Sequence, residues 1–222
     1  MTATVEFLQA SPYFVGMNST ELEFIASLFY QKIIDKGSSI TWENDPGEAL
    51  YFVISGAVKC FKVSRGGKEQ IIRIVLPGGS FNDVAVFDRG ASPNSTEAMS
   101  LVNLYVISAQ DMRNLVNDYP KLTSNVTKVL TERIRHLLDL VDDLSFRQVI
   151  SRIAKILLEY ADGVGPKPKL TQQEMAALAG TAREVVGRSL KTLQEERVIR
   201  MERNRLVIAD KSGLSKIADS HS

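Results

Sequence analysis

The stretch LTQQEMAALAGTAREVVGRSLKTLQEER, residues 170–197, decides the fold of the C-terminal part of the chain. Thr171 and Thr181 each stand three positions before a glutamate, which is the spacing of a helix-capping box. Gly180 lies between them, where a tight turn is needed. Apolar residues follow each threonine at helical spacing. The stretch therefore predicts two short amphipathic helices joined by a glycine turn, which is the helix-turn-helix pattern.

The second predicted helix carries charged residues at its start. Its apolar side is formed by Val185, Val186, Leu190 and Leu193. Its first exposed turn presents Arg183, Glu184 and Arg188. In a helix-turn-helix, such side chains meet base edges in the major groove, where Arg pairs with guanine and Glu accepts from the cytosine amine. We therefore predict that these three side chains contact DNA bases; the alternative is a solvated face with ion pairs inside the helix.

Residues 198–208, VIRMERNRLVI, predict a β-hairpin that is rich in arginine. A hairpin after a helix-turn-helix is a wing, and its arginines suit contacts with phosphates, which position a protein on the duplex. The predicted phosphate contacts are Thr171, Gln173, Thr181, Ala182, Lys191, Arg203 and Arg205. The alternative for the whole segment is a winged helix that contacts a protein partner, next to a cyclic-nucleotide-type sensor domain.

Upstream, residues 120–146 contain no glycine and no proline after Pro120, and they carry two apolar stripes. The first stripe has the heptad spacing of a coiled-coil seam and consists of Thr127, Leu130, Ile134, Leu137, Val141 and Leu144. The second lies alongside it and consists of Val126, Val129, Arg133, His136 and Leu140. One stripe is enough to pack a helix on its own domain. We therefore predict that the first stripe, from Leu130 to Leu144, is the seam of a parallel homodimer; the alternative is that both stripes pack inside one chain.

The N-terminal part of the chain alternates between glycines and short β-rich runs. Asn18 and Glu21 first form a capping box, which predicts a helix near the start. After it, glycines recur roughly every ten residues, as in antiparallel sandwiches and barrels. The β-rich runs between them are 51–54, 58–63, 70–76 and 102–107, and residues 64–67 suit a hairpin tip. This pattern predicts an antiparallel barrel or sandwich.

Composition separates the two ends of the chain and excludes several classes of site. Acidic residues outnumber basic ones over 1–120, and the balance reverses over 167–211, which suits a second domain facing a polyanion. No apolar run approaches the roughly 20 residues of a membrane helix, and the start of the chain does not resemble a signal peptide. Cys60 is the single cysteine, so one chain holds no disulfide and no iron–sulfur cluster. We expect a cytoplasmic protein without contact to a membrane.

The sequence also lacks the common signatures of catalysis. It contains no Walker loop, no G-x-S-x-G elbow, no His cluster with metal-ligand spacing and no Cys/His pair. The adjacent carboxylates at 142–143 and 195–196 point in different directions on a helix and are typical of solvated faces. We therefore expect no enzyme activity and no metal ligands.

From about residue 15 to 209 the chain resembles the cAMP receptor protein / fumarate–nitrate reduction regulator (CRP/FNR) family of bacterial transcription regulators. The similarity is strongest in LSFRQVISRIAKILLEYA (144–161) and TAREVVGRSLKTL (181–193). The resemblance implies an α+β fold with three parts: a cyclic-nucleotide-binding-type β jelly roll (1–118), a dimerisation helix (119–145) and a winged helix-turn-helix (146–222). It also implies that the Arg-Glu-x-x-x-Arg set reads TGTGA-type half-sites, arranged as a palindrome in double-stranded DNA. By analogy with the family, the loop 162–168 would touch RNA polymerase.

The effector site departs from the family pattern for cAMP. PGGSFND, residues 77–83, is similar to the family's Pro-Gly-Asp-x-Phe-Gly-Glu segment, but Asn82-Asp83 replaces the Gly-Glu that cradles ribose and phosphate. Asn94 stands at the position of the phosphate-binding Arg, and Leu137-Leu138 at that of the Thr-Ser pair which reaches adenine. A phosphate without its counter-charge loses hydrogen bonds worth about 1.5–3 kcal/mol each. We therefore expect that cAMP does not bind tightly.

Three alternatives for the pocket stay open, and the sequence does not identify the effector. The first is a less anionic or more apolar effector, and its predicted contacts are Asn82, Asp83, Val84, Asn94, Ser95, Arg133, Leu137 and Leu138. The second is a pocket closed by side chains, in a regulator that needs no effector. The third is haem, for which His136 is the candidate axial ligand. A lone His on an amphipathic helix is more often a packed or exposed residue, so haem is the least favoured. Arg133 is expected to pair with Asp83 or with a ligand.

Overall fold

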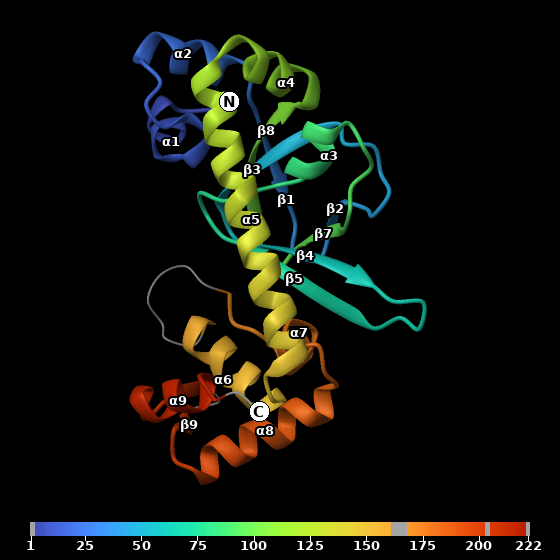
Figure 1. The fold of residues 1–222 in the computed structure, drawn as a ribbon, viewed down its shortest axis with the longest axis vertical. Helices are drawn as coiled ribbons and strands as arrows, with labels where there is room; N and C mark the ends of the chain where they lie inside the picture. The colour runs from blue at the N-terminus through green and yellow to red at the C-terminus, as the bar shows by residue number, and fades with distance from the viewer. Residues whose placement is uncertain (1–2, 161–167, 203–204, 221–222) are drawn as a thin grey trace. The chain divides into compact units, whose positions relative to one another are not determined.

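The computed structural model describes residues 3–160, 168–202 and 205–220. They form two compact units, the first composed of Met1–Lys62 and Arg73–His136, the second of Val63–Ile72 and Leu137–Ser222. Figure 1 shows the order of the elements along the chain. Residues 162–167 of the loop 162–168, which the resemblance connects with RNA polymerase, and Arg203 of the wing lie outside the described residues.

The first unit is built on two four-stranded sheets, with strand orders β1-β8-β3-β6 and β2-β7-β4-β5. The strands are β1 (Tyr30–Ile34), β2 (Ser39–Thr41), β3 (Ala49–Ser55), β4 (Val58–Val63), β5 (Glu69–Val75), β6 (Ser80–Phe81), β7 (Ser95–Ala98) and β8 (Val102–Ser108). The pairs β1–β8, β3–β8, β3–β6, β2–β7 and β4–β7 are antiparallel. The antiparallel β-roll predicted from the glycine spacing is therefore confirmed, and the four β-rich runs coincide with β3, β4, β5 and β8.

Short helices close one end of this roll with aromatic packing. They are α1 (Val5–Ala10), the 3-10 helix η1 (Pro12–Phe14), α2 (Ser19–Ser27), α3 (Asp83–Asp88) and α4 (Ala109–Asp118). Asn18 and Glu21 form the predicted capping box at the start of α2. Tyr13 and Phe14 pack against Phe52 of β3, with ring centroids 5.3 and 6.0 Å apart. This contact anchors η1, and with it Tyr13, at the end of the sheet.

The long helix α5 spans Pro120–Phe146, as predicted. Val126 and Val129 of the second stripe are buried in the core of the first unit. On the first stripe, Ile134, Leu137 and Val141 leave 57%, 45% and 60% of their surface exposed. Leu130 of the first stripe is partly buried against the same core. The second stripe therefore packs on the chain's own roll through Val126 and Val129. The first stripe is open further along the helix, at Ile134, Leu137 and Val141.

The C-terminal part contains the predicted winged helix-turn-helix. Its elements are α6 (Val149–Tyr160), α7 (Gln172–Ala179), α8 (Arg183–Glu195), β9 (Ile199–Glu202), β10 (Arg205–Ile208) and α9 (Lys211–Ala218). β9 and β10 pair antiparallel, which confirms the hairpin of the wing. Their core is formed by apolar residues that include Ile153, Leu157, Met175, Val186, Leu193 and Leu214. Within the described part of the chain, no helix is both long and apolar enough to cross a membrane.

Candidate functional site

The turn between α7 and α8 sets the position of the second helix. Thr171 caps α7, since its Oγ1 accepts from the Glu174 backbone N–H at 3.2 Å and the Glu174 carboxylate accepts from the Thr171 N–H at 2.6 Å. Gly180 ends α7 in the left-handed conformation, with φ of 65°. The expectation that Thr181 caps α8 is wrong, because α8 begins one residue later with Ala182 as its N-cap. The Thr181 N–H instead donates to the Ala176 carbonyl at 3.0 Å and closes the preceding helix.

The first two turns of α8 present an exposed charged face. Arg183, Glu184 and Arg188 are all exposed, while Val186 and Ser189 are buried on the other side. Within the described residues, none of the three charged side chains forms an ion pair; the nearby pair in α8 joins Lys191 and Glu195, at 3.8 Å. The alternative of ion pairs inside the helix is therefore not what the structure shows. The three side chains are available to a ligand.

The predicted phosphate contacts differ in exposure and come from several elements. Thr171, Gln173, Ala182 and Lys191 are exposed, and Thr181 is half-buried. Arg205 belongs to β10, where its backbone stands opposite Glu202 of β9. The described members thus lie at the starts of α7 and α8, further along α8 and on the wing. These are the places from which a helix-turn-helix contacts the DNA backbone.

A second site lies in the β-roll, where Asp83 is the centre of a buried polar network. The Asp83 carboxylate is 5% exposed and accepts from Arg133 Nε at 2.8 Å and from the Tyr13 hydroxyl at 3.2 Å. Arg133 Nη2 also donates to the carbonyl and hydroxyl oxygens of Ser80, at 2.8 and 3.0 Å. Arg73 Nη2 donates to the same carbonyl at 2.9 Å and lies 3.9 Å from Asp83 Oδ1. Five side chains from η1, β5, β6, α3 and α5 therefore meet at one point.

Burial and charge fix the protonation of this network. Burial, together with the charge of Asp83, raises the pKa of Tyr13 above its ordinary value, so Tyr13 stays a neutral hydroxyl donor. Burial lowers the pKa of Arg73. Burial acts in the same direction on Arg133 and is the largest single effect there, but the charge and hydrogen bond of Asp83 together with smaller contributions outweigh it, and the pKa of Arg133 is raised. Both guanidinium groups remain charged at neutral pH because their ordinary pKa lies so high.

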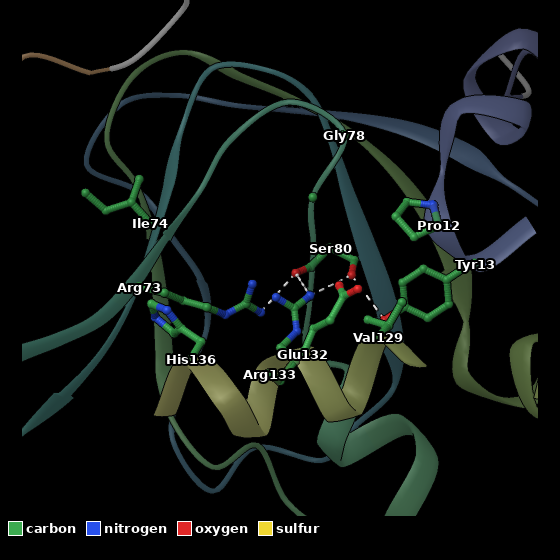
Figure 2. A pocket seen from close by; sticks show the side chains of 11 residues that line it. Pro12, Tyr13, Arg73, Ile74, Gly78, Ser80, Val129, Glu132, Arg133 and His136 are labelled. Atoms are coloured by element: carbon green, nitrogen blue, oxygen red, sulfur yellow. Dashed lines mark hydrogen bonds between the residues drawn. The ribbon is translucent and has the colours of Figure 1, made fainter. Parts of the chain in front are cut away.

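A pocket with a volume of 310 Å³ opens beside the network (Figure 2). Its walls are formed by Pro12, Tyr13, Arg73, Ile74, Gly78, Gly79, Ser80, Val129, Glu132, Arg133 and His136. In Figure 2 the side chains of Arg73 and Arg133 both point toward Ser80. Glu132 and His136 are exposed residues of α5. The pocket thus combines two cationic groups with an apolar and glycine-lined wall.

Two family models match the chain in the order of its two units. Residues 31–119 match the cyclic nucleotide-binding domain, and residues 151–217 match the Crp-like helix-turn-helix domain. The chain is 32% identical over 212 residues to the cyclic AMP receptor protein of Thermus thermophilus. This match covers 95% of the chain and 98% of that protein. The chain belongs to the CRP/FNR family of transcription regulators. The resemblance inferred from the recognition helix is thereby confirmed.

Two further proteins are similar to most of the chain, one in sequence and one in fold. A CRP-like cAMP-activated global transcriptional regulator of Mycobacterium tuberculosis is 28% identical, with 96% of this chain and 99% of that protein covered. The structure of FixK2 from Bradyrhizobium japonicum has a TM-score of 0.77 at 20% identity, over 87% of this chain and 99% of that chain. The α+β architecture of β-roll, long helix and winged helix-turn-helix is therefore the family fold.

The structure does not gather the predicted effector residues around the 310 Å³ pocket. Among those residues, Arg133 alone lines it, and Asp83 lies behind it in the network. Asn82 adopts the left-handed conformation, with φ of 70°. Its side chain donates to the Ala49 carbonyl at 2.9 Å and accepts from the Ser92 hydroxyl at 2.8 Å. Asn82 is the N-cap residue of α3, but its side chain makes no capping hydrogen bond and instead connects to Ala49 and Ser92.

The other predicted effector residues are engaged elsewhere or exposed. Asn94 donates to the Ser95 carbonyl at 3.0 Å, and the Ser95 hydroxyl accepts from the Glu43 N–H at 3.0 Å. Val84, Leu137 and Leu138 expose 41%, 45% and 63% of their surface. His136, the candidate haem ligand, belongs to the wall of the pocket and is exposed. Within the described residues, no group of three His, Cys, Asp or Glu side chains could hold a metal ion.

Three residues of the polar network were not among the predicted effector contacts: Tyr13, Arg73 and Ser80. Arg73 is the cation that the stretch around Asn82 lacks, and it comes from β5 rather than from that stretch. The one sequence signal for it was an arginine inside the apolar run QIIRIVL, residues 70–76. Tyr13 and Ser80 gave no signal, because only the folded roll brings them to Asp83.

Proposed function

We propose that this CRP/FNR-type regulator is a homodimer that reads TGTGA-like half-sites and that its β-roll senses an effector other than cAMP. The observation that carries the DNA-reading part is the exposed face of α8, where Arg183, Glu184 and Arg188 have no ion-pair partner within the described residues. Charged side chains without partners at the start of a recognition helix match the donor and acceptor pattern of G·C pairs in the major groove. Palindromic DNA is the partner that two such helices in a symmetric dimer would fit.

The proposal that cAMP is not the effector is supported by the side chains at the positions that hold cAMP in the family. Asn94 is neutral, and its carboxamide is hydrogen-bonded to the neighbouring backbone. Leu137 and Leu138 offer no hydroxyl groups to an adenine. The cyclic phosphate would therefore lose its cation at this position, and the base would lose two polar contacts. A closed, effector-independent roll and a haem-bound roll remain the competing hypotheses.

The proposal that the winged helix reads DNA is tested by measuring binding to a labelled duplex that carries the TGTGA palindrome. Each lost base contact should cost about 1–3 kcal/mol, which is about 5- to 150-fold in Kd. We expect this loss for Arg183→Ala and Glu184→Ala on the palindrome, and a much smaller change on a scrambled duplex. Addition of millimolar cAMP should leave the Kd of the wild type unchanged.

The matched control is Lys216→Ala, which removes an exposed charge of α9 in the same unit. Its Kd should stay within about 2-fold of the wild type, since a rim charge acts mainly through screened long-range attraction. If Arg183→Ala bound the palindrome as tightly as the wild type, direct base reading would be excluded. If the wild type did not distinguish the palindrome from the scrambled duplex, the half-site assignment would be excluded.

A further inference from the structure

The wall of the pocket in the β-roll carries two arginines, Arg73 and Arg133, and one acidic residue, the exposed Glu132. The side chains of Arg73 and Arg133 are 16% and 24% exposed, so both guanidinium groups are largely removed from water. Within the described residues, Asp83 is the only carboxylate at ion-pair distance from either of them. One carboxylate cannot neutralise two guanidinium groups. A buried charge without a partner is costly, so the site is suited to an additional anion.

The two arginines share Asp83 unequally. Arg133 holds Asp83 through a direct Nε contact at 2.8 Å, whereas Arg73 Nη2 lies 3.9 Å from Asp83 Oδ1. The described residues accept one hydrogen bond from Arg73, at the Ser80 carbonyl. A guanidinium carries five N–H donors in a planar fork that fits two oxygens of a carboxylate or phosphate. Arg73 is therefore the group with donors left for a ligand.

The remaining wall fits a small ligand of this kind. Gly78 and Gly79 present backbone without side chains, and Pro12, Ile74 and Val129 provide apolar contacts. A volume of 310 Å³ is at the lower end of the range for small-molecule sites. We propose that this pocket binds a small metabolite bearing a carboxylate or phosphate group, held by Arg73 with Arg133 as the second cation.

This site is different from the one that the sequence predicted, because the two sets share Arg133 alone. Its regulatory meaning rests on the proposed sensor role of the β-roll. Arg133 belongs to α5, the helix that carries the proposed dimer seam. An anion beside Arg133 competes with Asp83 for the same guanidinium, and in this way a bound ligand would alter how α5 is held on the roll. Binding itself does not depend on DNA and is tested without it.

The test is isothermal titration of the full chain with two probes, inorganic phosphate and succinate, at constant ionic strength set with chloride. We expect saturable binding of at least one probe and none of succinamide, the neutral diamide. Binding of phosphate alone would assign the phosphate class, and binding of succinate alone the carboxylate class. If neither probe bound, the proposal would be wrong, whatever the outcome of the DNA titrations.

Variants then localise the site. Arg73→Gln should weaken binding of the active probe at least 10-fold, because it removes the charge and the fork. Arg135→Gln, an equal change two residues from Arg133 on α5, should leave the affinity unchanged. Glu132→Gln removes an exposed negative charge from the wall and should tighten binding several-fold. If Arg73→Gln does not fold, Glu132→Gln decides: an affinity equal to that of the wild type would overturn the assignment.

Discussion

Cys60 is a buried thiol in the middle of β4. Because of its burial, we expect the free energy of unfolding of the roll to fall at alkaline pH. The residue is 2% exposed and packs among apolar neighbours that include Val58 and Phe81. Burial raises the pKa of its thiol above the ordinary 9.0. The folded state therefore holds this proton more tightly than the unfolded state. The stabilisation is fully present below pH 9 and is lost as the pH rises further.

The expected size of this effect follows from the ordinary pKa. At pH 10 an unfolded thiol is mostly ionised, which removes about 1.4 kcal/mol from the free energy of unfolding if the folded thiol stays protonated. Between pH 7 and pH 10, the free energy of unfolding of Cys60→Ala should therefore fall by about 1.4 kcal/mol less than that of the wild type. Urea unfolding with a reductant measures this, and Val58→Ala is the control with a buried change but no titrating group. Parallel pH curves for Cys60→Ala and the wild type would contradict the prediction.

Residues differ in how far the sequence could place them. The exposure of Arg183 and Arg188 was predictable, because the apolar spacing of α8 fixes which side faces the core. The pairing of Arg133 with Asp83 was one of two expectations, and the 2.8 Å contact shows it. Arg73 was not predictable, since an arginine in a strand has two possible faces and only the neighbouring strands decide between them. The charge of the pocket therefore had to come from the structure.

Among the elements, the long and strongly patterned ones were predictable. The start of α5 at Pro120 agrees with the start of the run that lacks Gly and Pro, and its end at Phe146 follows the last residue of the heptad stripe, Leu144. The run itself continues to residue 162 and does not mark this end. By contrast, β2 and β6 were not predictable, because strands of two or three residues are too short to show alternation. The start of α8 was misplaced by one residue, since Thr181 offered a capping side chain but its backbone was already needed to close α7.

The glycines of the helix-turn-helix give opposite expectations for the same substitution. Gly180 has φ of 65°, and an added Cβ would lie 2.6 Å from Leu144 Cδ2. Gly180→Ala should therefore destabilise the unit by about 1–2 kcal/mol, the cost of a left-handed alanine. Gly187 lies inside α8, and the nearest atom to its added Cβ, Gln172 Oε1, is 3.9 Å away. Gly187→Ala should stabilise by about 0.5–1 kcal/mol, because alanine favours the helix.

Chemical denaturation of both variants, followed by far-UV circular dichroism, measures this pair. Each variant is the control of the other, since both add a single methyl group to a glycine of the same motif. The test concerns stability alone, because Gly187 belongs to the recognition helix and its variant is not expected to leave DNA affinity unchanged. Changes of the same sign in the two variants would show that the backbone conformation at Gly180 is not the deciding factor.

For the whole molecule, the order of the parts along the chain was easier to predict than the oligomeric state. The glycine spacing, the heptad and the winged motif together predicted a roll, a long helix and a DNA-binding part, and the family models match the first and the last of these. The proposed limits of these parts, near residues 118 and 145, stay a prediction, as do the homodimer and the effector. Assembly was harder to predict because a heptad stripe packs equally well inside one chain or between two. The open first stripe favours the second arrangement.

The homodimer is the prediction that belongs to this scale. Ile134, Leu137 and Val141 are exposed along one side of α5, and burying such side chains against a second copy contributes about 1.5–3 kcal/mol for each fully buried one. We expect the wild type to sediment at twice the 24.6 kDa of one chain. Val141→Glu should sediment as a monomer and lose affinity for the palindrome far more than for a single half-site. Lys128→Glu, an exposed change on α5 outside the stripe, should remain a dimer. A Val141→Glu variant that kept the dimer mass would show that the seam lies elsewhere.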